Sequence, residues 1–306
     1  MKKTIIAALA LVVMAGCNKT LIEMPVVDDA GYGYINFDIS ADSDMVVTKA
    51  IDTEDYLVTL QKCSSANGTF DAAWDSAKKF SDIQDDDTSV EGKQVKIESG
   101  QYYKIIVENN THNAIYSQND NKGDKHFYGE SEAKQLVAGG NIELAVECKV
   151  INTAVSVKPT ANFTNTFKNE VVTVSVDNRS WKFINVENEE AAAPVSETPV
   201  SFNGADMVYF PANTLEDTSG DSYYYADLSI QIKAATEASA TEKTYTISRR
   251  SKRAHWTQIT LDAGQNGAIK VTITATDDMN ETPVSETVTL DPLTNQEVQQ
   301  PENENN

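Results

Sequence analysis

The cysteines are the residues of this sequence with the clearest chemical capacity, and the surroundings of Cys17 predict a reaction. Residues 2–3 are lysines, and residues 4–14 form an apolar run that is too short to span a bilayer as a permanent helix. The small residues 15–16 then provide the cleavage site that a signal peptidase requires. We expect residues 1–16 to be removed as a signal peptide, with the cut directly before Cys17.

This arrangement resembles a bacterial lipobox, with Met14 where leucine is commonest. The resemblance implies export and a lipid anchor on Cys17, followed by a tether over residues 17–30. Several acyl chains, at about 0.8 kcal/mol per buried CH₂, would make this anchoring effectively stable. The lipid is the only contact with the membrane that the sequence predicts. The alternative is an ordinary secretory signal followed by an unmodified cysteine.

The other two cysteines, Cys63 and Cys148, fall in predicted strands of the first half of the chain. In an exported protein they could form a disulfide, which would close a long loop and contribute roughly 4 kcal/mol. The alternative is two buried free thiols in separate strands. The sequence leaves both alternatives open.

Residues for enzymatic catalysis do not assemble into a motif. The sequence has no Gly-x-Ser-x-Gly, no His-Glu-x-x-His and no phosphate-binding loop. The three histidines, His112, His126 and His255, are scattered, and none of the 46 acidic residues stands in a recognisable cleft context. We therefore expect a protein that is not an enzyme and that has neither a cofactor nor a metal site.

A basic cluster interrupts the otherwise acidic chain. Lys and Arg number 25 against 46 Asp and Glu, a net charge of −21, and loss of Lys2 and Lys3 with the signal peptide makes it −23. Such a charge argues against nucleic acid and against an anionic bilayer as binding surfaces. The predicted contact turn consists of Arg249, Arg250, Lys252, Arg253 and Trp256.

This turn is predicted to join two arms of a hairpin, one at residues 245–247 and the other at residues 256–261. It could bind an acidic protein or an anionic glycan with Trp256 as a stacking platform, or be a site of proteolytic processing. The alternative is a solvated turn with Trp256 in the core.

Hydrophobic alternation with a period of two predicts strands along most of the chain. Residues 33–40, 55–63, 94–107 and 224–232 show it clearly, and residues 142–157 carry it across a brief interruption at Asn152. The sequence therefore predicts an all-β protein of two antiparallel β-sandwich domains in series, residues 31–151 and 152–290. A polar tail, residues 291–306, follows. The short link between the domains predicts a fairly rigid pair.

A turn of the first domain has the pattern by which β-sandwiches pin a corner with a tyrosine. Gly100 to Tyr102 (Gly-x-Tyr) places an aromatic ring directly after the turn. We expect the ring of Tyr102 to be buried and its hydroxyl to bond to backbone.

Several motifs resemble Bacteroidetes lipoproteins of a domain family of unknown function. They are the strand Gly31 to Phe37 (Gly-Tyr-Gly-Tyr-Ile-x-Phe), the turn Gly100 to Tyr102, the pair Tyr128–Gly129 and the hinge Cys148 to Asn152. These lipoproteins are similar in layout to fimbrillin-type subunits of the type V pilus. The resemblance implies two sandwiches of transthyretin-like or Ig-like Greek-key topology and an outer-membrane address. For this protein we expect the cell surface rather than the periplasmic face.

The function implied is that of a non-catalytic lipoprotein acting as a binding or structural module. One alternative is a fimbrillin-like pilus subunit or tip adhesin, for which proteolysis after Lys49 would open a groove for a partner's strand. Another is a glycan-binding accessory lipoprotein. Asp75 to Ala77 also matches a short Bacteroidetes O-glycosylation pattern, which marks Ser76 as the acceptor.

Overall fold

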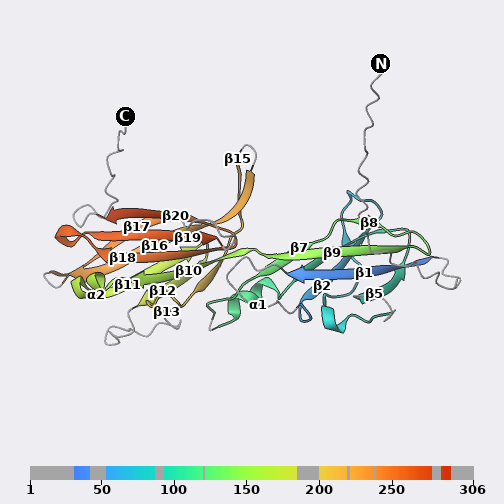
Figure 1. Ribbon diagram of the computed structural model, residues 1–306, viewed down its shortest axis with the longest axis horizontal. Coiled ribbons are helices and arrows are strands. Elements are labelled where there is room, and N and C mark those ends of the chain that lie inside the picture. Colours follow the sequence, from blue (N-terminus) through green and yellow to red (C-terminus); the bar gives the residue numbers. More distant parts are fainter. Residues whose placement is uncertain are drawn as a thin grey trace, which may run out of the picture.

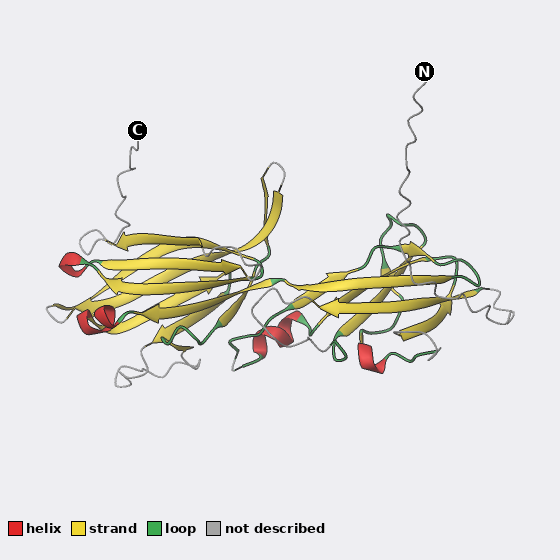
Figure 2. Ribbon diagram, in the orientation of Figure 1, coloured by secondary structure: helices red, strands yellow, loops and turns green. Residues whose placement is uncertain are grey.

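The computed structural model describes residues 31–41, 53–86, 93–119, 121–184, 200–218, 221–236, 239–277 and 284–290 of the 306-residue chain. Figure 1 shows two β-rich bodies arranged end to end along the longest axis. Strands account for most of the described residues, and the helices are short (Figure 2). The prediction of an all-β protein is confirmed.

The first body is a set of strands wrapped around one hydrophobic core. Its sheet has the order β3-β2-β6-β7-β9-β1-β5, with β4 beside β2 and β8 beside β6. A 3-10 turn, η1 (Phe80–Asp82), and a short helix, α1 (His112–Ser117), complete the body. The strands are β1 (Tyr32–Ala41), β2 (Leu57–Cys63), β3 (Asp71–Ala72), β4 (Lys78–Lys79), β5 (Lys93–Glu98), β6 (Tyr102–Glu108), β7 (Phe127–Glu130), β8 (Lys134–Gln135) and β9 (Asn141–Val150).

Strand β9 holds this body together because it pairs with two different neighbours along its length. Residues 141–148 run parallel to β1, and residues 149–150 pair with β7. The alternation expected from the sequence is present, since Leu144, Val146 and Cys148 are buried while the residues between them are exposed. One face of β9 thus contributes a continuous row to the core.

The second body is a β-sandwich of two sheets. One sheet has the order β14-β10-β18-β19-β20, and the other has the order β13-β12-β11-β16-β15 with β17 paired to β16. Both sheets contribute to one hydrophobic cluster, so they face each other. Helical segments are α2 (Ala161–Thr166) and η3 (Gln265–Gly267). The strands are β10 (Asn152–Pro159), β11 (Phe167–Val176), β12 (Arg179–Ile184), β13 (Val200–Ser201), β14 (Val208–Pro211), β15 (Thr214–Thr218), β16 (Asp221–Thr236), β17 (Ser239–Lys252), β18 (His255–Ala263), β19 (Ile269–Asp277) and β20 (Val284–Leu290).

The two bodies are joined by a single residue, Ile151, between β9 and β10. The prediction that one strand runs almost directly into the next is confirmed. Most pairings are antiparallel, as expected, but β1–β9, β10–β18 and β12–β13 are parallel. Hydrophobic alternation is the same for both directions, which is why the sequence did not predict these parallel pairs.

The predicted hairpin at residues 245–261 is wrong. Strand β17 pairs with β16, whereas β18 pairs with β10 and β19, so the two predicted arms lie in different sheets. The connection at Arg253 and Ala254 carries the chain from one sheet to the other, and Ala254 adopts a φ of 60° there. A short connection between two strands occurs both in hairpins and in crossings between sheets, so the sequence alone did not distinguish the two.

The predicted tyrosine corner is displaced by one residue. Tyr102 is only half-buried, whereas the ring of Tyr103 is fully buried and its hydroxyl donates to the Glu98 carbonyl at 2.7 Å. Successive strand residues point to opposite faces, so a shift of one residue decides which ring enters the core.

The predicted alternative of a Cys63–Cys148 disulfide is contradicted, because the structure holds both residues as free cysteines. Cys63 lies opposite Tyr102 at one end of β6, whereas the Cys148 thiol lies 3.8 Å from the carbonyl oxygen of Val107. These two points of β6 are about 17 Å apart at about 3.4 Å per residue. The β9 register therefore keeps the thiols from meeting.

The two thiols are expected to differ in reactivity. Cys148 is buried, and burial raises its pKa to about 12, whereas Cys63 is partly exposed. In the mature chain, where Cys17 is predicted to carry lipid, a thiol reagent should label Cys63 in the folded protein and both cysteines after unfolding. Mass spectrometry of the labelled peptides measures this. Labelling of Cys148 at the rate of Cys63 would contradict the burial.

A buried carboxyl group lies at a bulge of β11. Glu170 is 3% exposed, and the pairing of β11 with β16 shifts register between Lys168 and Val171. Neither carboxylate oxygen of Glu170 has a hydrogen-bond partner among the described residues, and burial raises the pKa of the group. The ionised form is therefore disfavoured in the folded protein.

Replacing Glu170 with glutamine is expected to stabilise the protein at neutral pH by about 1 kcal/mol, because it removes the buried charge. The pKa of Glu170 is higher in the folded state than in the unfolded state. Ionised Glu170 therefore lowers the free energy of unfolding at pH values above the raised pKa. This loss disappears as the pH falls towards the ordinary glutamate pKa near 4.3. Denaturant unfolding of both proteins at several pH values measures this. A constant difference at all pH values would show that the charge is not responsible.

Candidate functional site

The residues of the predicted contact turn are divided among three places. Arg250 and Lys252 lie exposed on the outer face of β17. Arg249 points to the edge of the sandwich and forms an ion pair with Glu286 of β20 at 3.0 Å. Arg253 and Trp256 are partly buried near the first body.

Arg250 and Lys252 form a surface with two tyrosines of β16, which we name the cation–tyrosine strip. It consists of Tyr223, Tyr225, Arg250 and Lys252. The Arg250 guanidinium lies 4.4 Å from the Tyr225 ring centroid, and the Lys252 ammonium lies 4.6 Å from that of Tyr223. Tyr225 and Lys252 are direct cross-strand partners, so both stacking contacts are diagonal. The rings hold the two cations in place on the surface.

Next to the strip, β15 and the start of β16 extend from the sandwich as a two-stranded arm (Figure 1). Leu215 and Tyr224 are opposite each other on this arm and are 53% and 40% exposed. The Arg253 guanidinium lies 3.9 Å from the Tyr224 ring centroid. Because Tyr224 alternates with Tyr223 and Tyr225 along β16, this exposed apolar pair lies on the face opposite to the strip.

Trp256 is not available as a stacking platform on this surface. Its indole nitrogen donates to the Ser156 hydroxyl at 2.9 Å, and its ring packs against the core of the first body. This placement favours the predicted alternative in which Trp256 is packed in the core. Of the predicted residues, the structure leaves Arg250 and Lys252 as the exposed cations of the strip.

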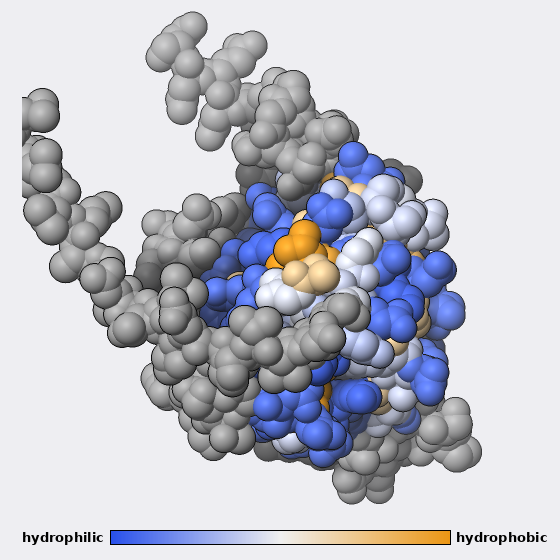
Figure 3. All heavy atoms as spheres, turned by 90° about the vertical axis from the view of Figure 1, so that its right-hand side faces the viewer, coloured by the Kyte–Doolittle hydropathy of each residue, from blue (hydrophilic) through white to orange (hydrophobic). Residues whose placement is uncertain are grey.

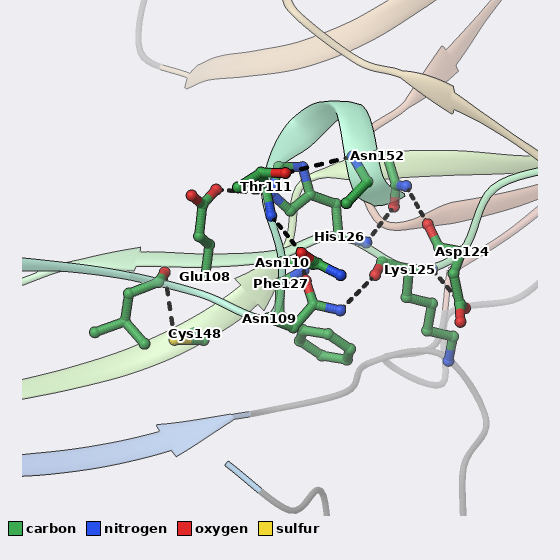
Figure 4. Close-up of polar contacts among 12 residues, drawn as sticks. Glu108, Asn109, Asn110, Thr111, Asp124, Lys125, His126, Phe127, Cys148 and Asn152 are labelled. Atoms are coloured by element: carbon green, nitrogen blue, oxygen red, sulfur yellow. Dashed lines mark hydrogen bonds and ion pairs between the residues drawn. The ribbon is translucent and has the colours of Figure 1, made fainter. Parts of the chain in front are cut away.

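A second polar cluster lies where the two bodies meet, around Asn152 (Figure 4). The Asn152 side chain is buried, its Oδ1 accepts from the His126 amide at 3.2 Å, and its Nδ2 donates to the Asp124 carbonyl at 2.8 Å. Its backbone carbonyl accepts from the Ala254 amide at 2.8 Å. One residue thus connects the loop after α1 to the crossing between the two sheets of the second body.

Arg179 of β12 makes a second link across the same junction. Its guanidinium donates to the carbonyl of Tyr209 in its own body at 2.9 Å, and to the carbonyls of Tyr116 and Asn121 in the first body. Gly123 lies against it with a φ of +87°, where a Cβ atom would be 3.2 Å from the Tyr209 Cβ. The close approach and the left-handed backbone both favour glycine at this position.

Two tyrosines and an arginine at this junction are partly buried. Burial raises the pKa values of Tyr116 and Tyr209 to about 12 and lowers that of Arg253. His112 is exposed at the surface, and partial desolvation, followed by the neighbouring His126 ring, lowers its pKa below the ordinary value. The junction is therefore an interface at which side chains of both bodies are in contact and partly desolvated.

Part of this junction is visible in the sequence. Asn152 was visible as a polar interruption in an alternating strand, whereas Arg179 is a lone arginine with no motif around it. Its role depends on carbonyl groups that are distant in the sequence. Only the folded chain brings these groups together.

Of the predicted modification and processing sites, the structure describes Ser76 but neither Cys17 nor Lys49. Ser76 is exposed in the segment between β3 and β4, where an attached glycan could be accommodated. Cys17 and Lys49 lie outside the described residues.

Among the described residues, no group of three or more His, Cys, Asp or Glu side chains is placed to hold a metal ion. In the same part of the chain, no helix has the length and apolarity required to cross a membrane.

Several solved structures are similar to this chain. A fimbrial assembly protein from Parabacteroides distasonis is 12% identical, with 84% of this chain and 98% of that chain covered and a TM-score of 0.35. The fimbrial anchor protein Mfa2 from Porphyromonas gingivalis is 9% identical, with 80% and 98% covered and a TM-score of 0.35. Similarity at these identities and TM-scores does not indicate a function for this chain.

No curated protein matches the chain. One family does, and its match extends over residues 31–290, from the start of β1 to the end of β20. The resemblance to a domain family of unknown function is thereby confirmed. The chain belongs to the family described as Domain of unknown function (DUF4493).

Proposed function

We propose that this protein is a non-catalytic lipoprotein of the outer membrane, at the cell surface, that acts as a binding or structural module. Its lipid is carried by Cys17, with residues 17–30 as tether and residues 291–306 as a polar tail. Residues 31–151 and 152–290 form two sandwich domains in series. The first domain stands next to the tether, and the second is presented away from the membrane.

The direction of β1 is the observation that carries this proposal. Residues 34–41 of β1 run parallel to residues 141–148 of β9, and β9 leads into the second body. The start of β1 therefore lies at the end of the first body that is remote from the second body. A tether attached there places the second body at the greatest distance from the anchor. Residues 141–159, which comprise β9, Ile151 and β10, extend over about 60 Å at about 3.3 Å per residue, and this length separates the far ends of the two bodies.

The first experiment is the intact mass and N-terminal sequence of the protein from native membranes. We expect a chain that begins at Cys17 and carries acyl groups, with the body intact to its C-terminus. Chains that begin elsewhere and carry no lipid would contradict the anchor. Protease treatment of whole cells then tests the surface location, because a surface protein is digested without breaking the cells.

We further propose the cation–tyrosine strip as the contact surface for a partner that carries carboxylate or sulfate groups, in a protein or a glycan. The strip presents two positioned cations on a chain of net charge −21, and anionic groups complement them. Binding to an array of uronate-containing and sulfated glycans and acidic peptides tests this. The double change Arg250→Ser and Lys252→Ser should abolish binding, whereas Lys182→Ser and Lys270→Ser should not. Equal losses in both variants would contradict a specific surface.

The second candidate function is that of a pilus subunit or tip protein, and the position of β1 favours it. Strand β1 lies in the sheet interior between β9 and β5, with Ile35 and Phe37 buried. Cleavage after Lys49 would allow β1 to leave and open a groove for a partner's strand. SDS-resistant ladders from cells and a new N-terminus after Lys49 would support it. Only full-length monomers with Cys17 retained would count against it.

A further inference from the structure

Large exposed hydrophobic side chains occur at two places among the described residues. One pair, Leu215 and Tyr224, belongs to the arm beside the cation–tyrosine strip. The other pair is Tyr32, 45% exposed, and Val137, 59% exposed. The second pair lies at the end of the first body where β1 begins, which we name the tip.

Three segments are connected by backbone hydrogen bonds at the tip. The Gly139 amide donates to the Tyr32 carbonyl at 2.7 Å, and the Ser99 amide donates to the Gly31 carbonyl at 2.8 Å. The Gly100 amide donates to the Leu136 carbonyl at 2.7 Å. The start of β1, the β5–β6 turn and the loop before β9 therefore form one connected surface.

The three tip segments are free of charged residues in a strongly charged chain. Residues 31–34, 99–101 and 136–142 contain no Asp, Glu, Lys or Arg, although charged residues make up 23% of the sequence. Val137 is followed by a small apolar alanine and two glycines. Figure 3 looks onto this end of the molecule and shows a small hydrophobic area surrounded by pale and hydrophilic surface.

We propose that the tip is a membrane-contact surface that rests on the lipid bilayer in which the chain is anchored. This rests on the lipid anchor proposed at Cys17. Residues 17–30 reach at most about 48 Å from the lipid at about 3.4 Å per residue, and they enter the folded body at the tip. The tip is therefore the part of the folded chain nearest to the anchor along the sequence, and it stays within about 48 Å of the lipid.

The chemistry of the tip fits this partner. A tyrosine ring places its apolar body and polar hydroxyl at the level of the lipid headgroups, and a valine side chain enters the apolar boundary beneath them. The Lys96 ammonium lies 5.4 Å from the Tyr32 ring centroid and can contact lipid phosphate. The tip segments themselves carry no carboxylate, although Glu98 of β5 is the exposed cross-strand partner of Tyr32. The tip therefore repels an anionic surface less than the rest of this chain of net charge −21 does.

Tryptophan quenching by brominated lipid tests the contact. The lipidated full-length chain carrying Val137→Trp, or separately Tyr32→Trp, is placed in phosphatidylethanolamine nanodiscs whose acyl chains carry bromine near the glycerol. Leu215→Trp is the matched control, because Leu215 is exposed to a similar extent and lies on the second body. We expect the added fluorescence at positions 137 and 32 to be largely lost relative to unbrominated nanodiscs, and that at position 215 to be retained.

The possible outcomes separate the two proposals. Unquenched fluorescence at positions 137 and 32, in protein whose mass shows acylated Cys17, overturns the membrane contact and leaves the anchor in place. Equal quenching at all three positions also overturns it, because the body would then lie flat on the bilayer. A mass without acyl groups overturns the anchor, and the membrane contact with it.

Discussion

Replacing Asn152 with alanine is expected to destabilise the protein by about 3 kcal/mol. The change leaves the buried His126 amide and the Asp124 carbonyl without their partner, and each unsatisfied buried group costs about 1 to 3 kcal/mol. Asn152 is 1% exposed, so water cannot easily replace the lost hydrogen bonds. Denaturant unfolding followed by circular dichroism measures the loss.

Asn203→Ala provides the matched control. The Asn203 side chain also bonds to two backbone amides, those of Ala205 and Asp206, but it is exposed. Water can replace its hydrogen bonds, and we expect a loss of about 0.5 kcal/mol. Similar losses for the two variants would show that the buried cluster at the junction is not special.

Replacing Arg179 with methionine is expected to cost about 3 kcal/mol and to loosen the junction between the two bodies. Methionine retains much of the apolar length of the side chain but removes the donors to the carbonyls of Tyr209, Tyr116 and Asn121. Hydrogen bonds from a charged donor are worth about 1.5 to 3 kcal/mol each, and their losses are not additive. Arg179→Lys should recover only part of the stability, because an ammonium lacks the planar fork of the guanidinium.

Two measurements report the effect of Arg179. Unfolding gives the stability, and small-angle X-ray scattering reports whether the bodies change their relative orientation. Arg250→Met is the control, since Arg250 is exposed on the cation–tyrosine strip and its ion pair with Asp227 spans 3.6 Å. We expect that variant to keep its stability within about 0.5 kcal/mol. Unchanged scattering and stability in Arg179→Met would contradict its role in the junction.

Local alternation of residues allowed much of the fold to be predicted. Ile35, Phe37 and Leu144 are buried as their spacing indicates, and β9 continues into β10 as expected. Partners of strands were not predictable in the same way, because alternation specifies which face is buried and not which strand lies alongside. The crossing at Arg253 and Ala254 therefore resembled a hairpin turn.

The candidate site was predictable to a smaller extent, for the same physical reason. A cluster of cations is visible in the sequence, but the direction of each side chain depends on the sheet that carries it. Arg250 and Lys252 face outward beside tyrosines of the preceding strand, whereas Trp256, a few residues later, is packed against the other body. The role of Arg179 depends on three carbonyl groups from distant segments, which no local pattern encodes.

The parallel pairing of β1 with β9 also determines how the molecule bears mechanical tension. If the chain is held before β1 and the second body is pulled, β1 is drawn towards its start and β9 towards its end. The two parallel strands are then sheared past each other along the register from Tyr34 opposite Asn141 to Ala41 opposite Cys148. The evenly spaced hydrogen bonds of this ladder share the force, so they must break together and cannot open one by one from an end. Flow or a moving ligand would therefore stretch this protein along the direction in which its first sheet is strongest.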